Sequence, residues 1–321
     1  MIHAEDMTIR LMVGKGQVGF CRGPYKMAHG YTIFMSLLSL HNYLKVCRNM
    51  TEPDRVTTDT SSEGISIITI NRPQRKNAVD PPTAKALYEA ILAFENDSKQ
   101  KVCVLAGAGD TFCAGADLHG VAKADHGTPG ENLQSVDGRN LGPMGPSRMI
   151  VKKPIICAVS GYAVAGGLEL SLLADIRVVE EEAVFGVFCR RWGVPLIDGG
   201  TVRLQAIVGL GRAMDMILTG RPVGAQEALT MGLASRVVPK GESLKEAIVI
   251  ARQLIAFPEL CLNTDRRSCY YSAYEASSFQ DAMSHEFNAG KKVISKEAIA
   301  GAAKFSKGLG RHGNFKDHSK L

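Results

Sequence analysis

The sequence predicts an α/β fold with a helical C-terminal part. Three apolar runs have the length and composition of buried strands, at residues 65–70, 102–105 and 155–159. A helical pattern separates the first two runs, and from residue 212 onward the pattern is mostly helical. Strands that alternate with helices indicate a layered α/β protein, and helices that gather at one end indicate a further helical region.

The first strand and the helix after it have clear boundaries. Isoleucine occupies four of the six positions in residues 65–70, and Asn71-Arg72-Pro73 ends the run. Pro81-Pro82 then opens a helix whose apolar residues recur at helical spacing: Ala84, Leu87, Ala90, Ile91 and Phe94. Residues 119–147 form a long loop rich in Gly and Pro, and loops of this size are usually functional or mobile.

The middle of the chain continues with short elements. The strand at residues 155–159 leads through Gly166-Gly167 into a buried helix expected from Leu170. Two short strands at residues 176–179 and 184–186 precede a second Gly-rich turn at residues 190–201. A helix with apolar residues at 202, 204, 207 and 208 is expected after this turn, and further helices at residues 213–218, 225–231, 244–256, 278–289 and 296–307.

Composition and charge exclude several classes of function. The net charge is +6, and residues 1–50, with six Lys and Arg against two acidic residues, leave only +2 for the remainder, so nucleic-acid binding is not expected. The eight cysteines include no Cys-x-x-Cys pair and the eight histidines are dispersed, which predicts a reducing compartment and no metal site. No apolar run reaches the length of about 18 residues that a membrane span needs.

Two strand-to-turn segments carry the candidate chemistry. Residues 160–169, with the Gly166-Gly167 pair, follow one apolar strand, and residues 110–118 follow another. Each such turn can expose an unpaired backbone N–H, and two of these aimed at one carbonyl oxygen form an oxyanion hole. The alternative is an ordinary strand-to-helix turn in which the glycines serve packing.

The same segments give the sequence a family resemblance. The stretches Phe112–Leu118 (FCAGADL) and Gly161–Glu169 (GYAVAGGLE) resemble the enoyl-CoA hydratase/isomerase (crotonase) superfamily, as do residues 70–78 and 220–239. The resemblance covers about residues 62–316 with the motifs in the right order. It implies a crotonase-like spiral of ββα units followed by a helical C-terminal region that packs into trimers.

The resemblance also implies an activity and its catalytic groups. Superfamily members bind acyl-CoA and stabilise a thioester enolate, and the matching oxyanion donors are the backbone N–H groups of Ala116 and Gly166. Glu169 matches the carboxylate that handles water or protons in the hydratases; alternatively, it is an acid placed near a helix N-terminus. The expected activity is that of an enoyl-CoA hydratase or an enoyl/dienoyl-CoA isomerase in fatty-acid β-oxidation.

One position departs from the hydratase pattern. Hydratases carry a second glutamate twenty residues after the first, and here that position is Cys189. The thiol is either a small buried filler or an acid or nucleophile whose pKa the adjacent arginines lower. Asp198, in Asp198-Gly199-Gly200-Thr201, offers a replacement acid, and the alternative is that it caps the next helix. Other interpretations are thioester hydrolysis, C–C bond chemistry, or a non-catalytic relative that binds CoA or RNA.

The remaining expectations concern binding and assembly. By motif position, the residues expected to meet CoA are Arg75, Lys76, Ala78, Ala114, Asp117 and Leu118. Lys307, Arg311 and Lys316 are further candidates for a CoA phosphate, and the 119–147 loop is expected to wall the acyl pocket. CoA is expected only as part of the substrate, with no separate cofactor, and a homotrimer or homohexamer is expected.

The last predictions concern domain boundaries and subcellular localisation. Residues 1–55 are interpreted as an N-terminal extension, either targeting or disordered, residues 56–255 as the acyl-CoA-binding core, and residues 256–321 as the helical oligomerisation region. The C-terminal Ser319-Lys320-Leu321 matches the signal read by the peroxisomal import receptor, which favours the peroxisome. The stretch from Met7 to Thr51 lacks acidic residues, so the mitochondrion is the alternative.

Overall fold

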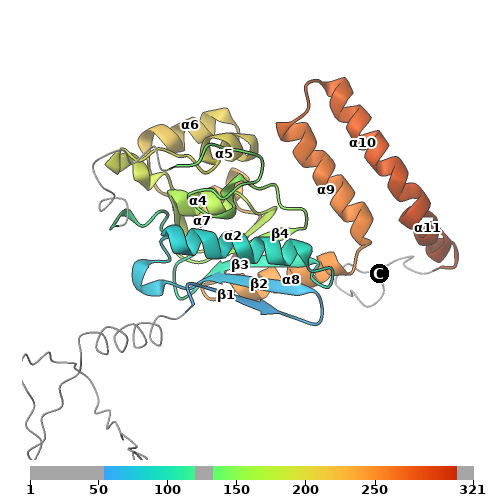
Figure 1. Cartoon of the computed structure of the whole chain (residues 1–321), viewed down its shortest axis with the longest axis horizontal. Helices are drawn as coiled ribbons and strands as arrows, with labels where there is room; N and C mark the ends of the chain where they lie inside the picture. The colour runs from blue at the N-terminus through green and yellow to red at the C-terminus, as the bar shows by residue number, and fades with distance from the viewer. Residues whose placement is uncertain (1–53, 120–132, 309–321) are drawn as a thin grey trace, which may run out of the picture. The chain divides into compact units, whose positions relative to one another are not determined.

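The computed structural model describes residues 54–119 and 133–308 (Figure 1). Most of the predicted N-terminal extension, the middle of the long loop, and the C-terminal tail with Arg311, Lys316 and Ser319-Lys320-Leu321 lie outside these residues. The described part is a mixed α/β structure that ends in helices, as the sequence predicts.

The larger sheet has six strands in the order β1-β2-β3-β4-β6-β9. The first strand pairs antiparallel with the second, and every other pairing in this sheet is parallel. The strands are β1 (Val56–Thr60), β2 (Ile65–Ile70), β3 (Val102–Gly107), β4 (Ile155–Val159), β6 (Ile176–Glu180) and β9 (Arg236–Val238). The apolar runs of the sequence are therefore the central strands of this sheet.

A smaller sheet makes the repeating unit visible. It holds β5 (Tyr162–Val164), β7 (Val184–Gly186) and β8 (Val223–Gly224) in that order. The chain places β4 in the large sheet, β5 in the small sheet, and then forms α4 (Gly166–Ser171); β6 and β7 repeat the step. This is the predicted spiral of ββα units. β5 is absent from the expectations because its three residues follow directly on the Gly161 turn.

Two apolar clusters lie on opposite faces of the large sheet. Helix α2 (Pro81–Asn96) packs with alternate strand residues such as Cys103 and Leu105. Helix α8 (Ser243–Ile255) packs with the intervening ones, such as Val102 and Val104. A parallel sheet covered on both faces requires strands that are apolar on both sides, which is why the strands read as continuous apolar runs.

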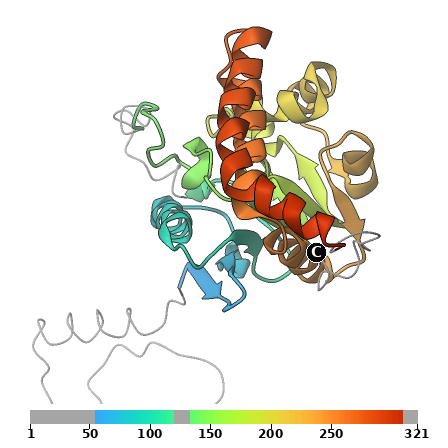
Figure 2. The ribbon, with the colours of Figure 1, turned by 90° about the vertical axis from the view of Figure 1, so that its right-hand side faces the viewer.

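The remaining helices follow the second half of the sheet. They are α5 (Gly200–Val208), α6 (Leu210–Thr219), α7 (Ala225–Thr230), α9 (Glu259–Tyr274), α10 (Phe279–Val293) and α11 (Ile299–Ser306), with a π-helical segment (Ile294–Ala298) before the last. Short 3-10 turns form at Pro73–Arg75, Pro146–Arg148 and Phe188–Trp192. Figures 1 and 2 show α9 and α10 as neighbouring antiparallel helices.

Helix α9 is absent from the sequence expectations. Its sixteen residues include few aliphatic side chains, so no apolar stripe marks it. Tertiary contacts hold it instead, because Arg266 forms an ion pair with Asp175 at 2.7 Å and the Tyr270 hydroxyl donates to the same carboxylate. No single described helix is long and apolar enough to cross a membrane; α8 and α9 pass that test only as a pair bent by 112°.

Candidate active site

Three segments far apart in the sequence lie side by side at the candidate site. Residues 76–79 run beside residues 114–117, since Val79 N–H donates to Gly115 C=O and Asp117 N–H donates to Val79 C=O, each at 2.8 Å. The segment that contains residues 114–117 also pairs on its other side with β5, through Cys113. The two strand-to-turn segments of the sequence, residues 110–118 and 160–169, are therefore brought together by backbone pairing.

The closest approach of the two turns is at Gly115 and Gly166. A Cβ on Gly115 would lie 2.9 Å from the Gly166 nitrogen, and Gly115 also has a φ of +97°. Both features exclude a larger residue there. Ala165 has a φ of +54°, an unfavourable conformation for a residue with a side chain, and this bend directs the Gly166 N–H out of the chain.

The two predicted oxyanion donors are both available. The pairing with Val79 uses the C=O of Gly115 and the N–H of Asp117, which leaves the N–H of Ala116 outside the ladder. Gly166 is the first residue of α4, where N–H groups have no acceptor within the helix. In the residues that the structure describes, neither N–H donates a hydrogen bond.

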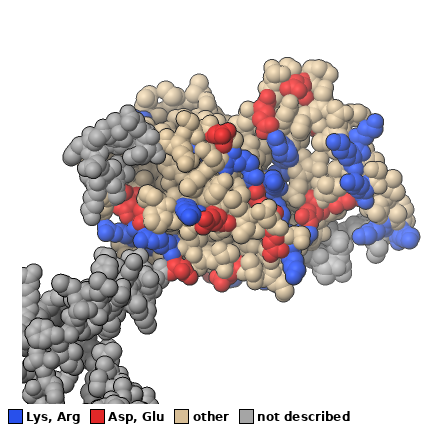
Figure 3. Space-filling view, viewed as in Figure 1, with Lys and Arg blue, Asp and Glu red and all other residues tan. Residues whose placement is uncertain are grey.

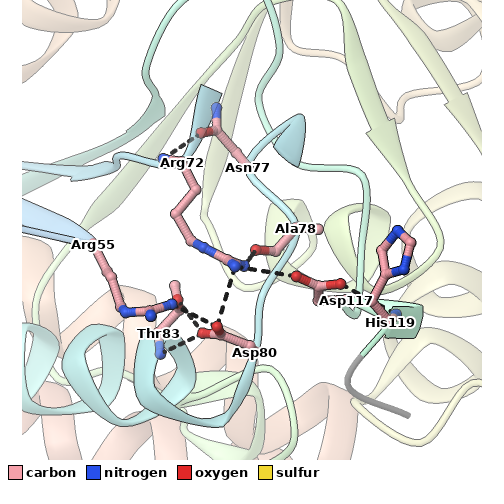
Figure 4. Close-up of polar contacts among 8 residues, drawn as sticks. All are labelled: Arg55, Arg72, Asn77, Ala78, Asp80, Thr83, Asp117 and His119. Carbon is pink, nitrogen blue, oxygen red and sulfur yellow. Dashed lines mark hydrogen bonds and ion pairs between the residues drawn. The ribbon is translucent and has the colours of Figure 1, made fainter. Parts of the chain in front are cut away.

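A buried ion-pair cluster supports the Ala116 turn (Figure 4). Arg72 lies 3.1 Å from the carboxylates of both Asp117 and Asp80, and it also donates to Ala78 C=O. Asp80 in turn pairs with Arg55 and caps α2. The Asp117 carboxylate is thus occupied by Arg72 and its N–H by Val79 C=O, so the polar group of Asp117 left for another contact is its backbone C=O.

The other residues predicted to meet CoA lie on the same two segments. Arg75 and Lys76 are exposed, Ala78 and Ala114 are half-buried, and Leu118 is exposed at the start of a helical turn. Lys76 lies 3.4 Å from Asp110 in an exposed ion pair. The structure therefore brings these positions together around one loop, whereas Lys307 lies at the end of α11.

The sequence analysis did not single out Asn77, which fixes the loop at residues 71–78. Its side chain is fully buried, accepts from the N–H of Arg72 at 2.9 Å, and donates to the C=O groups of Ala108 and Thr111. These bonds hold Lys76 and Asn77 at positive φ, which orders the loop that carries Arg75 and Lys76. Its place in the Asn71-to-Ala78 motif was the available signal.

Glu169 lies in α4 with its carboxylate at the N-terminus of α5. One oxygen, Oε1, accepts from the N–H of Asp198 at 2.9 Å and from the N–H of Gly200 at 2.8 Å. The residue is 3% exposed, and a Cβ on Gly200 would lie 2.9 Å from the carboxylate. The other oxygen, Oε2, has no hydrogen-bond partner among the described residues.

The surroundings of Glu169 adjust its proton affinity. The pKa of Glu169 is raised to about 7: burial is the main cause and the nearby charge of Asp198 adds to it, while the N–H donors of Gly200 and Asp198 act in the opposite direction. Burial disfavours the ionised carboxylate because water no longer solvates it. A group with this pKa can both accept and return a proton near neutral pH.

Asp198 lies in the same site and does not cap a helix. Its Oδ1 accepts from the N–H of Met144 at 2.9 Å and from the hydroxyl of Ser147. The N-cap position of α5 is Gly199, and no side chain caps that helix. The helix-cap alternative is therefore wrong, because the Gly-Gly turn directs the Asp198 side chain toward the 144–147 segment instead.

Cys189 is a buried neutral thiol beside Glu169. Burial raises its pKa, the charge of Glu169 raises it further, and the weaker effect of Arg190 does not reverse this. The guanidinium of Arg190 donates to Ile217 C=O, and that of Arg191 stacks on the Phe188 ring. The hypothesis of an arginine-activated thiolate is therefore wrong.

Three further residues belong to the site but were missed in the sequence. Met144 and Ser147 lie in the described end of the long loop, which the sequence analysis expected to wall the acyl pocket without naming these residues. A Cβ on Gly166 would lie 2.6 Å from the Met144 sulfur, so Met144 covers this glycine. Arg203 donates to the C=O groups of Ser147, Asp198 and Met149. Only its position shortly after the Asp198 turn could have drawn attention to it.

Comparison with known proteins agrees with this geometry. The family model for enoyl-CoA hydratase/isomerase matches residues 60–306. The chain belongs to this family. It therefore has the crotonase fold and is an enoyl-CoA hydratase/isomerase-type enzyme of acyl-CoA thioesters.

Individual relatives share much of the chain. Enoyl-CoA hydratase EchA19 of Mycobacterium tuberculosis is 36% identical over 209 residues, which cover 63% of this chain and 75% of that protein. Short-chain-enoyl-CoA hydratase of Clostridium acetobutylicum is 30% identical over 236 residues, covering 69% and 87%. The crystal structure of enoyl-CoA hydratase EchA1 from Mycobacterium marinum superposes with a TM-score of 0.72 at 31% identity, covering 79% and 96%.

The raised pKa of Glu169 predicts a pH-dependent stability. The Glu169 carboxyl binds its proton more tightly in the folded protein than in the unfolded chain. Its contribution to the free energy of unfolding is therefore complete below the ordinary glutamate pKa and is lost as the pH rises through about 7. Glu169→Gln lacks this loss. Its free energy of unfolding, relative to wild type, should therefore increase between pH 4.5 and pH 8 by up to about 3 kcal/mol.

Thermal or urea unfolding at both pH values measures this difference. Glu89→Gln is the matched control, because Glu89 is exposed in a surface ion pair with Lys85. Its difference from wild type at the two pH values is the reference for an exposed glutamate. A Glu169→Gln difference that rises no more than this reference would contradict the raised pKa of Glu169.

Proposed function

We propose that this protein adds water across the double bond of a 2-enoyl-CoA thioester, with Glu169 and Asp198 as its acid–base pair. The supporting observation is a pair of unpartnered N–H groups, at Ala116 and Gly166, in the same site as two buried carboxylates. The relatives reported above carry the names of enoyl-CoA hydratases, and others are named crotonyl-CoA hydratase and carnitinyl-CoA dehydratase. CoA enters only as part of the substrate.

The oxyanion pair stabilises the charge that the reaction creates. When hydroxide adds to C3, the electron pair of the double bond moves through C2 onto the thioester oxygen. The N–H groups of Ala116 and Gly166 donate to that oxygen, and each donor of this kind lowers a barrier by about 3 kcal/mol. Their positions are fixed before the substrate binds, so the transition state costs no reorganisation of the backbone.

Glu169 carries the transferred proton, and Asp198 is the second carboxylate beside it. Glu169 uses its free Oε2 to take a proton from the attacking water while Oε1 stays on the two N–H groups of the Asp198 turn. The proton then returns to C2 as the enolate collapses, so water is added without net gain or loss of protons. Asp198 supplies the second carboxylate that the thiol of Cys189 cannot, since that thiol remains neutral.

The CoA portion binds along the paired segments 75–78 and 114–118. The exposed Arg75 and Lys76 are suited to phosphate groups, and Lys76 can exchange its exposed partner Asp110 for one. Ala78, Ala114, Asp117 and Leu118 present backbone and small or apolar surface to the pantetheine and adenine.

Double-bond migration is the second candidate reaction. It is favoured by Cys189, which stands at the position of the second glutamate of the hydratases. The site then holds two carboxylates, Glu169 and Asp198, in different surroundings. One acid can then remove a proton from one carbon while the other delivers a proton to another. The products distinguish the two reactions, because hydration consumes water and migration does not.

Substitution of the three residues tests the assignment. Glu169→Gln should lower kcat by about 100-fold or more, because the acid–base group is lost while its hydrogen bonds remain. Asp198→Asn should lose activity without a matching loss of thermal stability, and Cys189→Ser should stay close to wild type. The assay follows loss of the conjugated enoyl thioester on a panel of enoyl- and dienoyl-CoAs, with the products separated by chromatography. Near-full activity of Glu169→Gln on every substrate would refute the mechanism.

We also propose a homotrimer or a dimer of trimers assembled through the C-terminal helices. Large apolar side chains are exposed along α10 and its continuation: Phe279, Met283, Phe287 and Ile294. An apolar stripe of this kind on a soluble protein usually marks an interaction surface. The face in Figure 3 carries basic side chains interleaved with acidic ones, which supports a protein partner over nucleic acid.

Light scattering tests the assembly. The protein at micromolar concentration should scatter as three or six copies, and the double variant Phe279→Glu/Phe287→Glu should dissociate because charge is inserted into the apolar contact. Val136→Glu, at an equally exposed valine outside these helices, is the control. A wild-type monomer would contradict the proposal.

We propose that the protein is localised in the peroxisome, where its reaction would be a step of fatty-acid β-oxidation. The support is the C-terminal Ser319-Lys320-Leu321, and the mitochondrion remains the alternative. A fluorescent protein fused ahead of residue 1 should enter peroxisomes and should become diffuse when Leu321 is deleted. Identical behaviour with and without Leu321 would count against this address.

A further inference from the structure

Asp198 is held by a segment about fifty residues away in the chain. Its Oδ1 accepts from the N–H of Met144 at 2.9 Å and from the hydroxyl of Ser147, and the residue is 4% exposed. No described residue donates to its Oδ2. One oxygen of the carboxylate is therefore anchored from two directions and the other is free.

A tight turn presents both donors to that oxygen. Gly142 and Gly145 exchange two backbone hydrogen bonds of 2.9 Å, and Pro143 and Met144 lie between them. A Cβ on Gly142 would lie 3.1 Å from the Asp198 Oδ1 and would clash with the Ser147 hydroxyl oxygen. The glycine thus leaves the space in which the hydroxyl reaches the carboxylate.

Arg203 fixes the same segment from α5. Its guanidinium donates to the C=O of Ser147 at 2.7 Å, to that of Asp198 at 3.3 Å, and to that of Met149 at 3.1 Å. Ser147 and Asp198 are therefore tied through their backbones as well as through their side chains. Ser147 itself is 1% exposed, so bulk solvent does not compete for its hydroxyl proton.

We propose that Ser147 is a positioning residue of the reaction, whose hydroxyl holds Asp198 as an oriented carboxylate beside Glu169. This inference rests on the proposed acid pair and adds a residue that acts through Asp198 without touching substrate. The charged or titratable groups around Asp198 are Glu169 from α4, Arg203 from α5 and Arg148 from the 146–148 turn, and Cys189 lies beside Glu169.

The direction of the effect follows from the hydrogen bond. An O–H donor stabilises a carboxylate more than a carboxylic acid, and here the Ser147 hydroxyl opposes the rise in the pKa of Asp198 that burial causes. Without the hydroxyl, Asp198 binds its proton at higher pH. The acid limb of the kcat/KM profile should then move to higher pH.

Five variants, compared with wild type, test this role. Ser147→Ala should lower kcat about tenfold, the size expected for one hydrogen bond to a charged group, and should shift the acid limb upward. Ser147→Cys, with a weaker donor of similar shape, should fall between Ser147→Ala and wild type. Ser171→Ala is the matched control, because Ser171 is equally buried but donates to Leu168 C=O. Asp198→Asn/Ser147→Ala should be no slower than Asp198→Asn alone, since Ser147 acts only through that carboxylate.

The results separate this inference from the proposed function. If Asp198→Asn keeps wild-type activity, the acid pair is wrong and the role of Ser147 fails with it. If Asp198→Asn is slow but Ser147→Ala has the wild-type rate and pH profile, only the role of Ser147 is overturned. It is equally overturned if Ser147→Ala loses activity with an unshifted profile or if the two substitutions add.

Discussion

The site depends on a close approach of two backbones at Gly115 and Gly166. With 2.9 Å between the position of a Cβ on Gly115 and the Gly166 nitrogen, only hydrogen fits between the turns. The parallel pairing of residues 113–117 with Val79 on one side and β5 on the other makes this approach obligatory. It places the N–H groups of Ala116 and Gly166 near one another and keeps both outside the hydrogen-bond ladders.

Buried charge is the second constraint, and it is met by three backbone N–H donors and the Ser147 hydroxyl. Glu169 and Asp198 are both almost fully buried, which would be unfavourable without partners. Each carboxylate is instead anchored through one oxygen by two donors and keeps the other oxygen free. The same turn, 198–200, supplies both donors to Glu169 and carries Asp198, so the two acids are oriented as a unit.

The support for the oxyanion turn lies in another layer of the molecule. Arg72 joins Asp117, next to the donor Ala116, to Asp80 at the start of α2 (Figure 4). Because this cluster is mostly buried, its ion pairs are less screened than surface pairs. The position of one proposed oxyanion donor is thereby linked to helix α2, which gives the Asn71-to-Ala78 loop a structural role beside the site.

The sequence by itself determined the central strands, helix α2 and the two Gly-rich turns, because their signals are local: apolar runs, helical spacing and glycine. It also determined the family, since four motifs stand in order. Only the tertiary structure determined α9, whose polar sequence is held by Arg266 and Asp175, and the orientation of Asp198, for which the sequence left a site acid and a helix cap as alternatives. Met144, Ser147 and Arg203 could also be identified as site residues only from the tertiary structure, because hydrogen bonds between residues some fifty positions apart leave no periodic pattern in the sequence.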